Sequence, residues 1–458
     1  MKKAPFTLAT LILTVALATT VANAQAFTDL FDFNGTDGAL PESPNLLAQG
    51  RDGNLYGTTL QGGVYGSGVV FVIKPNGIQR VLFSFDYHTG GFLPESGLTL
   101  GTDGDFYGTT SEDNVFFQGN VFKITPSGSL TTLYTFTGGT DSGFPHAPPI
   151  EGTHGTFYGT TAYGYNPSIY EITPSGAFTV LGQLPGDSLG SLIEGSDGNF
   201  YGTTTSGGSG SNCPGGCGTV FKATPKGIVT TLNNFYGQNG AKPWGGVTQG
   251  SDGNLYGTAT AGGTNKRGVI FKLSPKGITI LHNFPDPNYG KDGEQPYALI
   301  QATDGNFYGI APRGGTSDFG VIFEITPSGV YSILHNFDGT HGGYASSTLV
   351  QHTNGKIYGL TNAGGHSNDG VVYSLDLGLP PFVRLVSPSG KVGQTGGILG
   401  QGFTGATNVF LNGTSAAFTI MSDTYLTATV PPGATTGFVT VVTPSGTLTS
   451  NQEFQVRP

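Results

Sequence analysis

The stretch Leu30-Phe31-Asp32-Phe33 decides the fold. Its Leu-x-x-Phe pattern recurs at the end of later repeats, but no repeat precedes this first copy. Later copies each close a repeat that begins with an Asp-Gly-Asn-Leu-Tyr-Gly-like turn, and they end at Phe85, Phe136, Phe235, Phe284 and Phe337. The first copy has no repeat before it, and the last repeat, around Tyr358-Gly359, has no copy after it. A closed ring explains both facts, since the N-terminal strand then completes the last repeat.

Tyr-Gly pairs mark the repeats and recur roughly every 50 residues, which is typical of β-propeller blades. We number the repeats 1 to 7 by these pairs, at 56–57, 107–108, 158–159, 201–202, 256–257, 308–309 and 358–359. Seven units lie within the usual range of roughly 4–8 blades. We therefore expect an all-β fold in which residues 25–379 form a seven-bladed β-propeller, closed by the strand 27–33.

The first 24 residues have the order of a secretory signal peptide: two lysines, a mostly apolar run and a small-residue cleavage site at Ala22-Asn23-Ala24. An uncleaved membrane anchor is the alternative, but the apolar run is short and interrupted by threonines. No later apolar run is long enough to span a bilayer, so we expect no transmembrane segment after cleavage. The expected location is secreted, periplasmic or at the cell surface.

The negative net charge of the chain argues against polyanionic partners. The net charge is −10, and removal of the signal with its two lysines makes it −12. An acidic chain with only 10% charged residues is a poor ligand for nucleic acids and for anionic membranes. Neither a phosphate-binding loop nor a His-Glu-x-x-His motif is present, so the sequence indicates no cofactor and no metal.

Two cysteines, Cys213 and Cys217, lie in one glycine-rich loop of repeat 4. In an exported protein, this spacing favours a local disulfide. A metal site is the alternative, but it requires two further ligands that the sequence does not place nearby.

The recurring Tyr-Gly-Thr-Thr, Gly-Gly, Gly-x-Val-Phe-x-Ile-x-Pro-x-Gly and Leu-x-x-Phe elements resemble the GloVer tandem-repeat family of exported bacterial proteins. The resemblance covers roughly residues 27–378 and implies export, without an established activity or known catalytic residues. Repeats 2, 3 and 6 depart from the pattern; repeat 2, for example, has Ser111-Glu112 where the double glycine is expected.

After Leu379-Pro380-Pro381 the repeat period stops. The order of strand and turn segments that follows resembles an IPT/TIG domain, which implies an immunoglobulin-like β-sandwich over 380–458. Such modules usually serve as spacers or as binding partners of a larger domain.

The ring is expected to have two unequal faces. The Asp-Gly-Asn and Thr-Pro-Ser-Gly turns share one face and are nearly uniform, whereas the loops of the other face vary in length and composition. Variable loops on a rigid scaffold are where function usually lies. We therefore expect the active or binding surface on the variable-loop face, near the central channel.

One position on that face follows a recurring proline. Its occupants are Glu42, Glu95 and His146, then Asp187, and finally Trp244, Tyr297 and Tyr344. The first three are candidate catalytic residues for general acid–base chemistry on a sugar. The three aromatic residues are candidates for stacking on sugar rings, and Asp187 for binding. The alternative is structural: glutamates that cap backbone N–H groups and aromatic rings that plug the channel.

Other polar residues are weaker candidates. Arg313 is suited to a uronate carboxylate or to a salt bridge within the protein. Glu112 and Asp113 are candidates for a cation or a hydroxyl group, and His341, His366 and Asp369 for a metal. The leading functional hypothesis is a recognition protein that binds an extracellular glycan or a surface protein on the variable-loop face. The alternatives are an extracellular polysaccharide hydrolase or lyase, and a structural repeat protein of the envelope.

Overall fold

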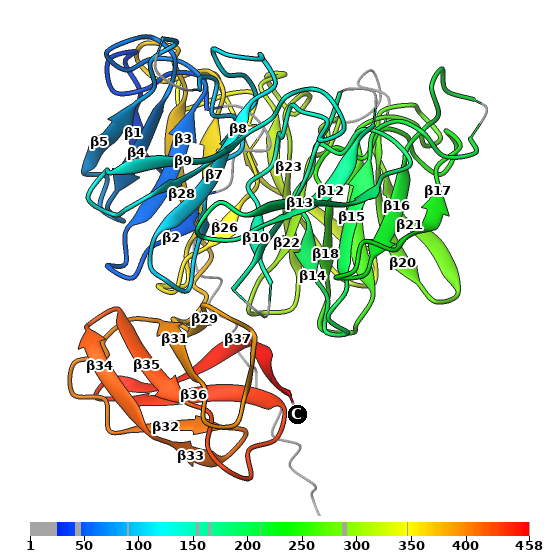
Figure 1. Ribbon diagram of the computed structural model, residues 1–458. Coiled ribbons are helices and arrows are strands. Elements are labelled where there is room, and N and C mark those ends of the chain that lie inside the picture. The colour runs from blue at the N-terminus through cyan, green and yellow to red at the C-terminus, as the bar shows by residue number, and fades with distance from the viewer. Residues whose placement is uncertain are drawn as a thin grey trace, which may run out of the picture.

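The computed structural model describes residues 25–41, 47–88, 91–152, 155–163, 166–210, 212–285, 291–345 and 347–457. Over these residues every regular element is a strand, so the all-β prediction is confirmed, and the arrangement is that of a β-propeller with a smaller unit beneath it (Figure 1). The expected signal peptide, residues 1–24, lies outside the described residues. None of the described residues forms a helix that could span a bilayer.

Within residues 26–376 the described strands form seven four-stranded antiparallel sheets, one for each Tyr-Gly repeat. The first four are β2 (Ala48–Gln49), β3 (Leu55–Thr59), β4 (Val69–Ile73) and β5 (Gln79–Ser84); β6 (Thr99–Leu100), β7 (Phe106–Thr110), β8 (Asn120–Ile124) and β9 (Leu130–Thr135); β10 (Ile150–Glu151), β11 (Phe157–Thr160), β12 (Ser168–Ile172) and β13 (Phe178–Gln183); and β14 (Ile193–Glu194), β15 (Phe200–Thr204), β16 (Thr219–Ala223) and β17 (Val229–Asn234).

The remaining three sheets are β18 (Val247–Gln249), β19 (Leu255–Ala259), β20 (Val269–Ser274) and β21 (Gly277–Asn283); β22 (Leu299–Gln301), β23 (Phe307–Ala311), β24 (Val321–Ile325) and β25 (Tyr331–Asn336); and β26 (Val350–Gln351), β27 (Ile357–Thr361), β28 (Val371–Asp376) and β1 (Ala26–Asp32). The first six sheets take all four strands from consecutive chain. The seventh takes its outer strand from the N-terminus.

The N-terminal strand β1 pairs antiparallel with β28, with Phe27 opposite Leu375 and Asp32 opposite Val371. Directly after it, the Phe33 N–H donates to Gly370 O at 3.0 Å, as the Phe85 N–H donates to Gly68 O at 2.9 Å in repeat 1. Phe33 is fully buried. The first Leu-x-x-Phe copy therefore occupies in repeat 7 the place that its later copies occupy in the others.

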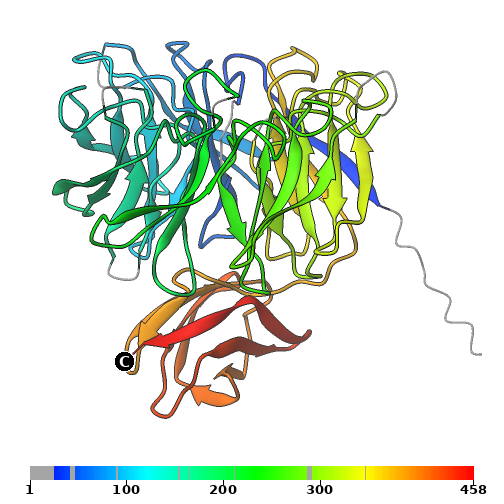
Figure 2. The same ribbon diagram turned by 90° about the vertical axis from the view of Figure 1, so that its right-hand side faces the viewer.

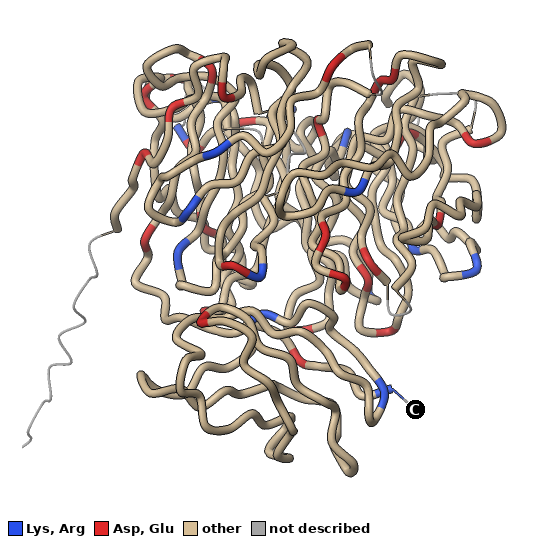
Figure 3. The backbone as a smooth tube through the Cα atoms, turned by 60° about the vertical axis from the view of Figure 1, so that its left-hand side comes forward, with Lys and Arg blue, Asp and Glu red and all other residues tan. Residues whose placement is uncertain are grey.

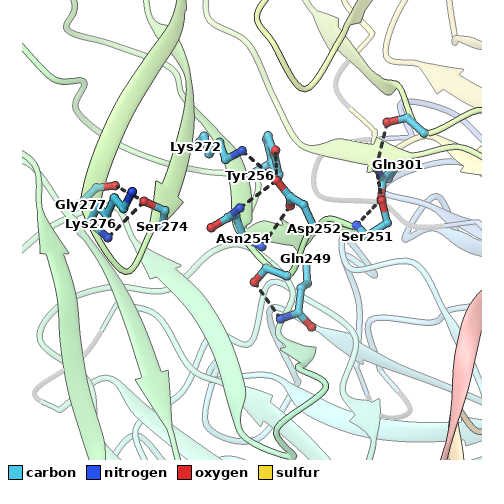
Figure 4. Close-up of polar contacts among 12 residues, drawn as sticks. Gln249, Ser251, Asp252, Asn254, Tyr256, Lys272, Ser274, Lys276, Gly277 and Gln301 are labelled. Atoms are coloured by element: carbon cyan, nitrogen blue, oxygen red, sulfur yellow. Dashed lines mark hydrogen bonds and ion pairs between the residues drawn. The ribbon is translucent and has the colours of Figure 1, made fainter. Parts of the chain in front are cut away.

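In repeats 1, 2, 4, 5 and 6 the turn aspartate anchors the tyrosine that follows it. In repeat 5, Asp252 accepts the Asn254 N–H at 3.1 Å and the Tyr256 hydroxyl at 2.8 Å (Figure 4). The anchored ring of Tyr256 then stacks on Phe307 of the next sheet, with centroids 4.0 Å apart. The aspartate therefore bonds both to the backbone of its own turn and to the tyrosine hydroxyl. The turn aspartate thus orients the tyrosine ring that packs against the next sheet.

Residues 384–457 form two further sheets that pack around a separate core, which includes Val383, Leu426 and Val441. The four-stranded sheet contains β29 (Arg384–Leu385), β31 (Thr395–Leu399), β35 (Tyr425–Thr429) and β34 (Phe418–Ser422). The five-stranded sheet contains β30 (Ser389–Lys391), β37 (Gly446–Arg457), β36 (Gly437–Thr443), β32 (Asn408–Leu411) and β33 (Thr414–Ala416). We call residues 380–457 the C-terminal unit.

The C-terminal unit lies beneath the turn face of the propeller (Figure 2). Thr424 Oγ1 donates to Arg51 O at 2.8 Å, and Gln401 Nε2 donates to Thr353 Oγ1 at 2.9 Å. The Arg51 guanidinium also lies 4.6 Å from the centroid of the Tyr425 ring. The unit therefore covers the face of uniform turns and leaves the variable loops on the opposite side.

Candidate functional site

The position that follows the recurring proline is structurally the same in four repeats. In each, the residue before the proline has a positive φ and donates its N–H to a carbonyl of the preceding repeat: Leu93 to Ser67, Phe144 to Gln118, Lys242 to Cys217, and Gln295 to Arg267. The residues directly after the proline are Glu95, His146, Trp244 and Tyr297. The sequence equivalence proposed for these four therefore agrees with their backbone geometry.

Tyr344 and Asp187 lie two residues earlier than expected. The Tyr344 N–H donates to Phe319 O at 2.8 Å, the bond that Leu93 makes in repeat 2. Asp187 O accepts the Thr205 N–H, as Leu93 O accepts the Ser111 N–H. The sequence-based alignment was wrong for both residues because it relied on the proline. Repeat 7 has alanine in place of this proline, and repeat 4 has glycine between its proline and Asp187.

Glu42 lies outside the described residues, as does position 346, which is the equivalent of Glu95 in repeat 7. The three candidate catalytic residues therefore reduce to a described pair, Glu95 and His146.

Glu95 and His146 are in direct contact. Oε2 of Glu95 lies 2.5 Å from Nδ1 of His146, and the two side chains are 18% and 16% exposed. The Ser111 hydroxyl donates to the other carboxylate oxygen at 3.2 Å. Nε2 of His146 is buried and has no hydrogen-bond partner among the described residues. A carboxylate at Nδ1 fixes the orientation of the imidazole and leaves Nε2 for chemistry or binding.

Repeats 3 and 4 add Tyr163 and Asp187 to this pair. The Tyr163 ring lies edge-on to His146, with centroids 5.3 Å apart. The Tyr163 N–H donates to one Asp187 oxygen at 3.1 Å, and the Ser206 hydroxyl donates to the other at 2.8 Å. Burial raises the pKa of Tyr163, and the charges of Asp187 and Glu95 add to this effect. We call Glu95, His146, Tyr163 and Asp187 the polar arc.

An aromatic arc lies across the ring, in repeats 5 to 7. Trp244 and Tyr297 meet edge to face, with centroids 5.8 Å apart. The Arg313 guanidinium lies 5.9 Å from the centroid of the Tyr344 ring, within cation–π range. No carboxylate lies within 4.0 Å of Arg313 in the described part of the chain, so the salt bridge considered as its alternative role is not formed there.

Two of the weaker candidates have structural roles. Asp113 is buried and accepts backbone N–H groups from Val115, Phe116, Gln118 and Gly119. His341 pairs with Asp338, with 2.9 Å between Nδ1 and Oδ2. Among the described residues, no three His, Cys, Asp or Glu side chains are grouped to hold a metal ion. The metal site considered for His341, His366 and Asp369 is therefore not formed.

Cys213 and Cys217 form a disulfide in the repeat 4 loop. Cys217 is fully buried against the core between repeats 4 and 5, and its carbonyl accepts the Lys242 N–H at 2.9 Å. The bridge therefore fixes the loop that supports the segment leading to Trp244.

Exposed apolar side chains on the loops of repeats 1 and 2 were missed by sequence reasoning. They are Val64, Tyr65, Tyr87, Val115, Phe116 and Phe117, each 44–81% exposed. The run Val115-Phe116-Phe117, in a loop where the double glycine is absent, is the signal from which they were predictable.

Comparison with known proteins places the repeats in one family. The Gloeobacter/Verrucomicrobia repeat model matches residues 15–166, 141–291 and 277–401. A search of curated proteins found no relative that matches the chain.

Several solved structures are similar to the chain at low identity. A copper-bound fungal alcohol oxidase of the AA5 family has 13% identity, covers 94% of this chain and 99% of its own, and gives a TM-score of 0.48. The periplasmic gluconolactonase of Pseudomonas aeruginosa has 15% identity, covers 72% and 97%, and gives 0.46. Similarity at this level does not bear on what the chain binds or catalyses.

Proposed function

Because the chain belongs to the Gloeobacter/Verrucomicrobia repeat family, we propose that it is an exported recognition protein whose variable-loop face binds an extracellular glycan or a surface protein. In this proposal residues 1–24 are a cleaved signal, residues 25–379 form a closed seven-bladed ring, and residues 380–458 are an IPT/TIG-type immunoglobulin-like domain that spaces or docks the ring. The mature protein works outside the cytoplasm, in the periplasm or at the cell surface.

The observation that carries the proposal is the unequal use of the two faces. The C-terminal unit is hydrogen-bonded to the turn face, for example from Thr424 to Arg51, whereas the polar and aromatic arcs lie on the other face. The polar arc contains carboxylates that accept hydrogen bonds from hydroxyl groups, and the aromatic arc contains flat rings. This combination suits a saccharide, which presents both hydroxyl groups and C–H faces. The exposed rings of repeats 1 and 2 extend this surface outward.

The experiment is a glycan array and a surface-protein pull-down with the mature chain, residues 25–458. We expect Trp244→Ala and Tyr297→Ala each to weaken binding about tenfold, because each removes a stacking surface. Ile228→Ala is the matched control, since Ile228 is an exposed apolar residue in a tight turn of the opposite face. If a bound ligand is indifferent to both aromatic variants, the loop-face proposal is wrong.

A hydrolase or lyase is the second candidate, and the Glu95–His146 contact at 2.5 Å favours it. In this reading Glu95 orients the imidazole, and Nε2 of His146 exchanges a proton with the substrate. Glu95→Gln should abolish new reducing ends or unsaturated products while binding on the array persists. If no polysaccharide in a broad panel is cleaved by the wild-type chain, the enzyme reading fails and recognition remains.

A further inference from the structure

The lower end of the propeller channel is closed by the C-terminal unit and contains a cavity of about 340 Å³. Its walls come from the first strands of repeats 1, 2, 3, 6 and 7, through aliphatic side chains such as Leu47, Leu98 and Leu349. Its floor comes from β29 and β31 of the C-terminal unit, with Arg384 and Leu399. Two parts of the chain therefore build one chamber.

Among the described residues that line this chamber, Arg384 is the only charged one. Nη2 donates to Gln351 O at 2.6 Å, and no carboxylate lies within 4.0 Å of the guanidinium in the described part of the chain. Burial lowers the pKa of Arg384 to about 10, so the group stays charged at neutral pH. Arginines in apolar surroundings normally have an anionic partner, because desolvation of the charge is costly. The remaining N–H donors of Arg384 suit a carboxylate.

A second cavity, of about 600 Å³, adjoins the chamber and shares Ile300, Gln301 and Asn451 with it. It lies between the turns of repeats 4 and 5 with the strand β22 on one side and the strand β37 on the other. Charged residues are few along the C-terminal unit, as Figure 3 shows. The polar residues that this unit contributes to the cavity lining are Ser389, Asn451, Gln452, Gln455, Glu453 and Arg457.

Several polar groups of this second cavity are available to a ligand. Ser389 is 4% exposed, and its hydroxyl has no hydrogen-bond partner among the described residues. Gln455 and Glu453 alternate with the core residue Phe454 along β37, and neither side chain bonds another described residue. Phe438, which is 47% exposed, supplies an aromatic ring to the same lining. The carboxylate Glu194 is already paired with Arg457 at 3.5 Å.

We propose that this junction binds a hydroxylated carboxylate of the sugar-acid class, with its carboxylate on Arg384 and its hydroxyl groups on the polar side chains of the adjoining cavity. The site is separate from the variable-loop face, and it does not depend on the function proposed for that face. It gives the C-terminal unit a direct part in recognition, because the cation on which the site depends lies in β29.

Isothermal titration of the mature chain with D-glucuronate, D-glucose and acetate tests the proposal. We expect glucuronate to bind at least tenfold more tightly than either of the other two, because only glucuronate combines the carboxylate with the hydroxyl groups. Arg384→Gln should remove the preference for glucuronate over glucose, and Arg384→Lys should restore part of it. Arg80→Gln is the control for charge, because Arg80 is exposed on the outer strand β5.

The outcomes are distinct. Trigalacturonate that binds more tightly than galacturonate identifies a uronic acid unit of a polymer as the ligand, and equal affinities identify a free acid. Equal binding of glucuronate and glucose, binding of neither, or unchanged binding to Arg384→Gln each overturns the proposal. If Arg384→Gln loses glucuronate binding but keeps the glycan-array binding that Trp244→Ala weakens, the two sites are separate.

Discussion

Gln49 and Thr353 are 304 residues apart in the chain and exchange two hydrogen bonds. The Thr353 N–H donates to Gln49 Oε1 at 3.1 Å, and Gln49 Nε2 donates to Thr353 Oγ1 at 2.7 Å. Between repeats 5 and 6 the equivalent bond is present, since the Ser251 N–H donates to Gln301 Oε1 at 2.8 Å (Figure 4). The contact between the last repeat and the first is therefore chemically the same as an internal one.

Closure by the N-terminal strand predicts that Phe33 carries an unusually large share of stability for a residue so near the end of the chain. Phe33→Ala should lower the free energy of unfolding by about 3–5 kcal/mol, because a fully buried ring leaves a cavity. Phe116→Ala, which removes a ring that is 48% exposed, should change it by less than about 0.5 kcal/mol. Urea denaturation of the two variants measures both values.

Deletion of residues 25–33 extends this prediction. It leaves β28 with an unpaired edge, so we expect aggregation during expression or heating. A deletion variant that stays monomeric with an unchanged Tm contradicts closure by strand exchange.

The contacts of His352 predict that low pH weakens the contact between repeats 7 and 1. Its Nδ1 accepts the Asn354 N–H at 3.1 Å, and Nε2 lies 2.9 Å from Gly53 O in repeat 1. Both contacts are satisfied by the neutral ring with its proton on Nε2. Burial lowers the pKa of His352 to about 4, below the ordinary value of 6.5. The unfolded chain therefore binds the extra proton first as the pH falls, and stability that is present above pH 6.5 is lost between 6.5 and about 4.

We expect the wild type to lose up to about 3 kcal/mol through His352 between pH 7 and pH 4. Burial also lowers the pKa of His335 to about 4, and this ring stacks on Phe27 of β1, so it adds to the acid sensitivity. His352→Gln should flatten the dependence of unfolding free energy on pH across this window. A variant with the same slope as the wild type shows that other groups determine the acid response.

The turn aspartates predict a graded response to substitution. In repeat 7 the aspartate is replaced by Asn354, whose Nδ2 donates to the Tyr358 hydroxyl at 2.9 Å. Asp252→Asn in repeat 5 should therefore retain most of the anchoring of Tyr256. Asp252→Ala should destabilise the chain by about 1–3 kcal/mol, because it leaves the buried tyrosine end of the turn without its partner. Equal effects of the two variants on Tm rule out the hydrogen bond as the reason for the motif.

The β-propeller arrangement and its closing N-terminal strand were predictable because the motifs are repeated. Tyr-Gly, Asp-Gly-Asn and Leu-x-x-Phe recur at equivalent places, so each copy constrains the others, and the unmatched first copy identifies the closing strand. The position after the proline was predictable for Glu95, His146, Trp244 and Tyr297 for the same reason. It failed for Tyr344 and Asp187, where the marker proline is missing or displaced.

Contacts that depend on three-dimensional proximity were beyond sequence reasoning. Nothing in the chain indicates that Tyr163 meets His146, or that Arg384 enters the channel from another part of the chain. These residues belong to no repeated motif, and their partners come from different repeats or from the C-terminal unit. The role of Asp113 was likewise hidden, since a loop aspartate can bind a cation, water or its own backbone.

Asp113 predicts how the exposed rings of repeat 2 are held in place. Its carboxylate accepts four backbone N–H groups at 2.7–2.9 Å, and the loop they belong to presents Phe116 and Phe117 to solvent. Asp113→Ala should cost about 2–4 kcal/mol, because hydrogen bonds to a charged group are lost inside a buried site. It should also speed proteolysis within residues 112–119, whereas Glu112→Ala, which spares the carboxylate of Asp113, should leave the cleavage pattern unchanged. If limited proteolysis and Tm are the same in both variants, the loop is held by other contacts, and any effect of Asp113→Ala on ligand binding then reports a direct role of the carboxylate.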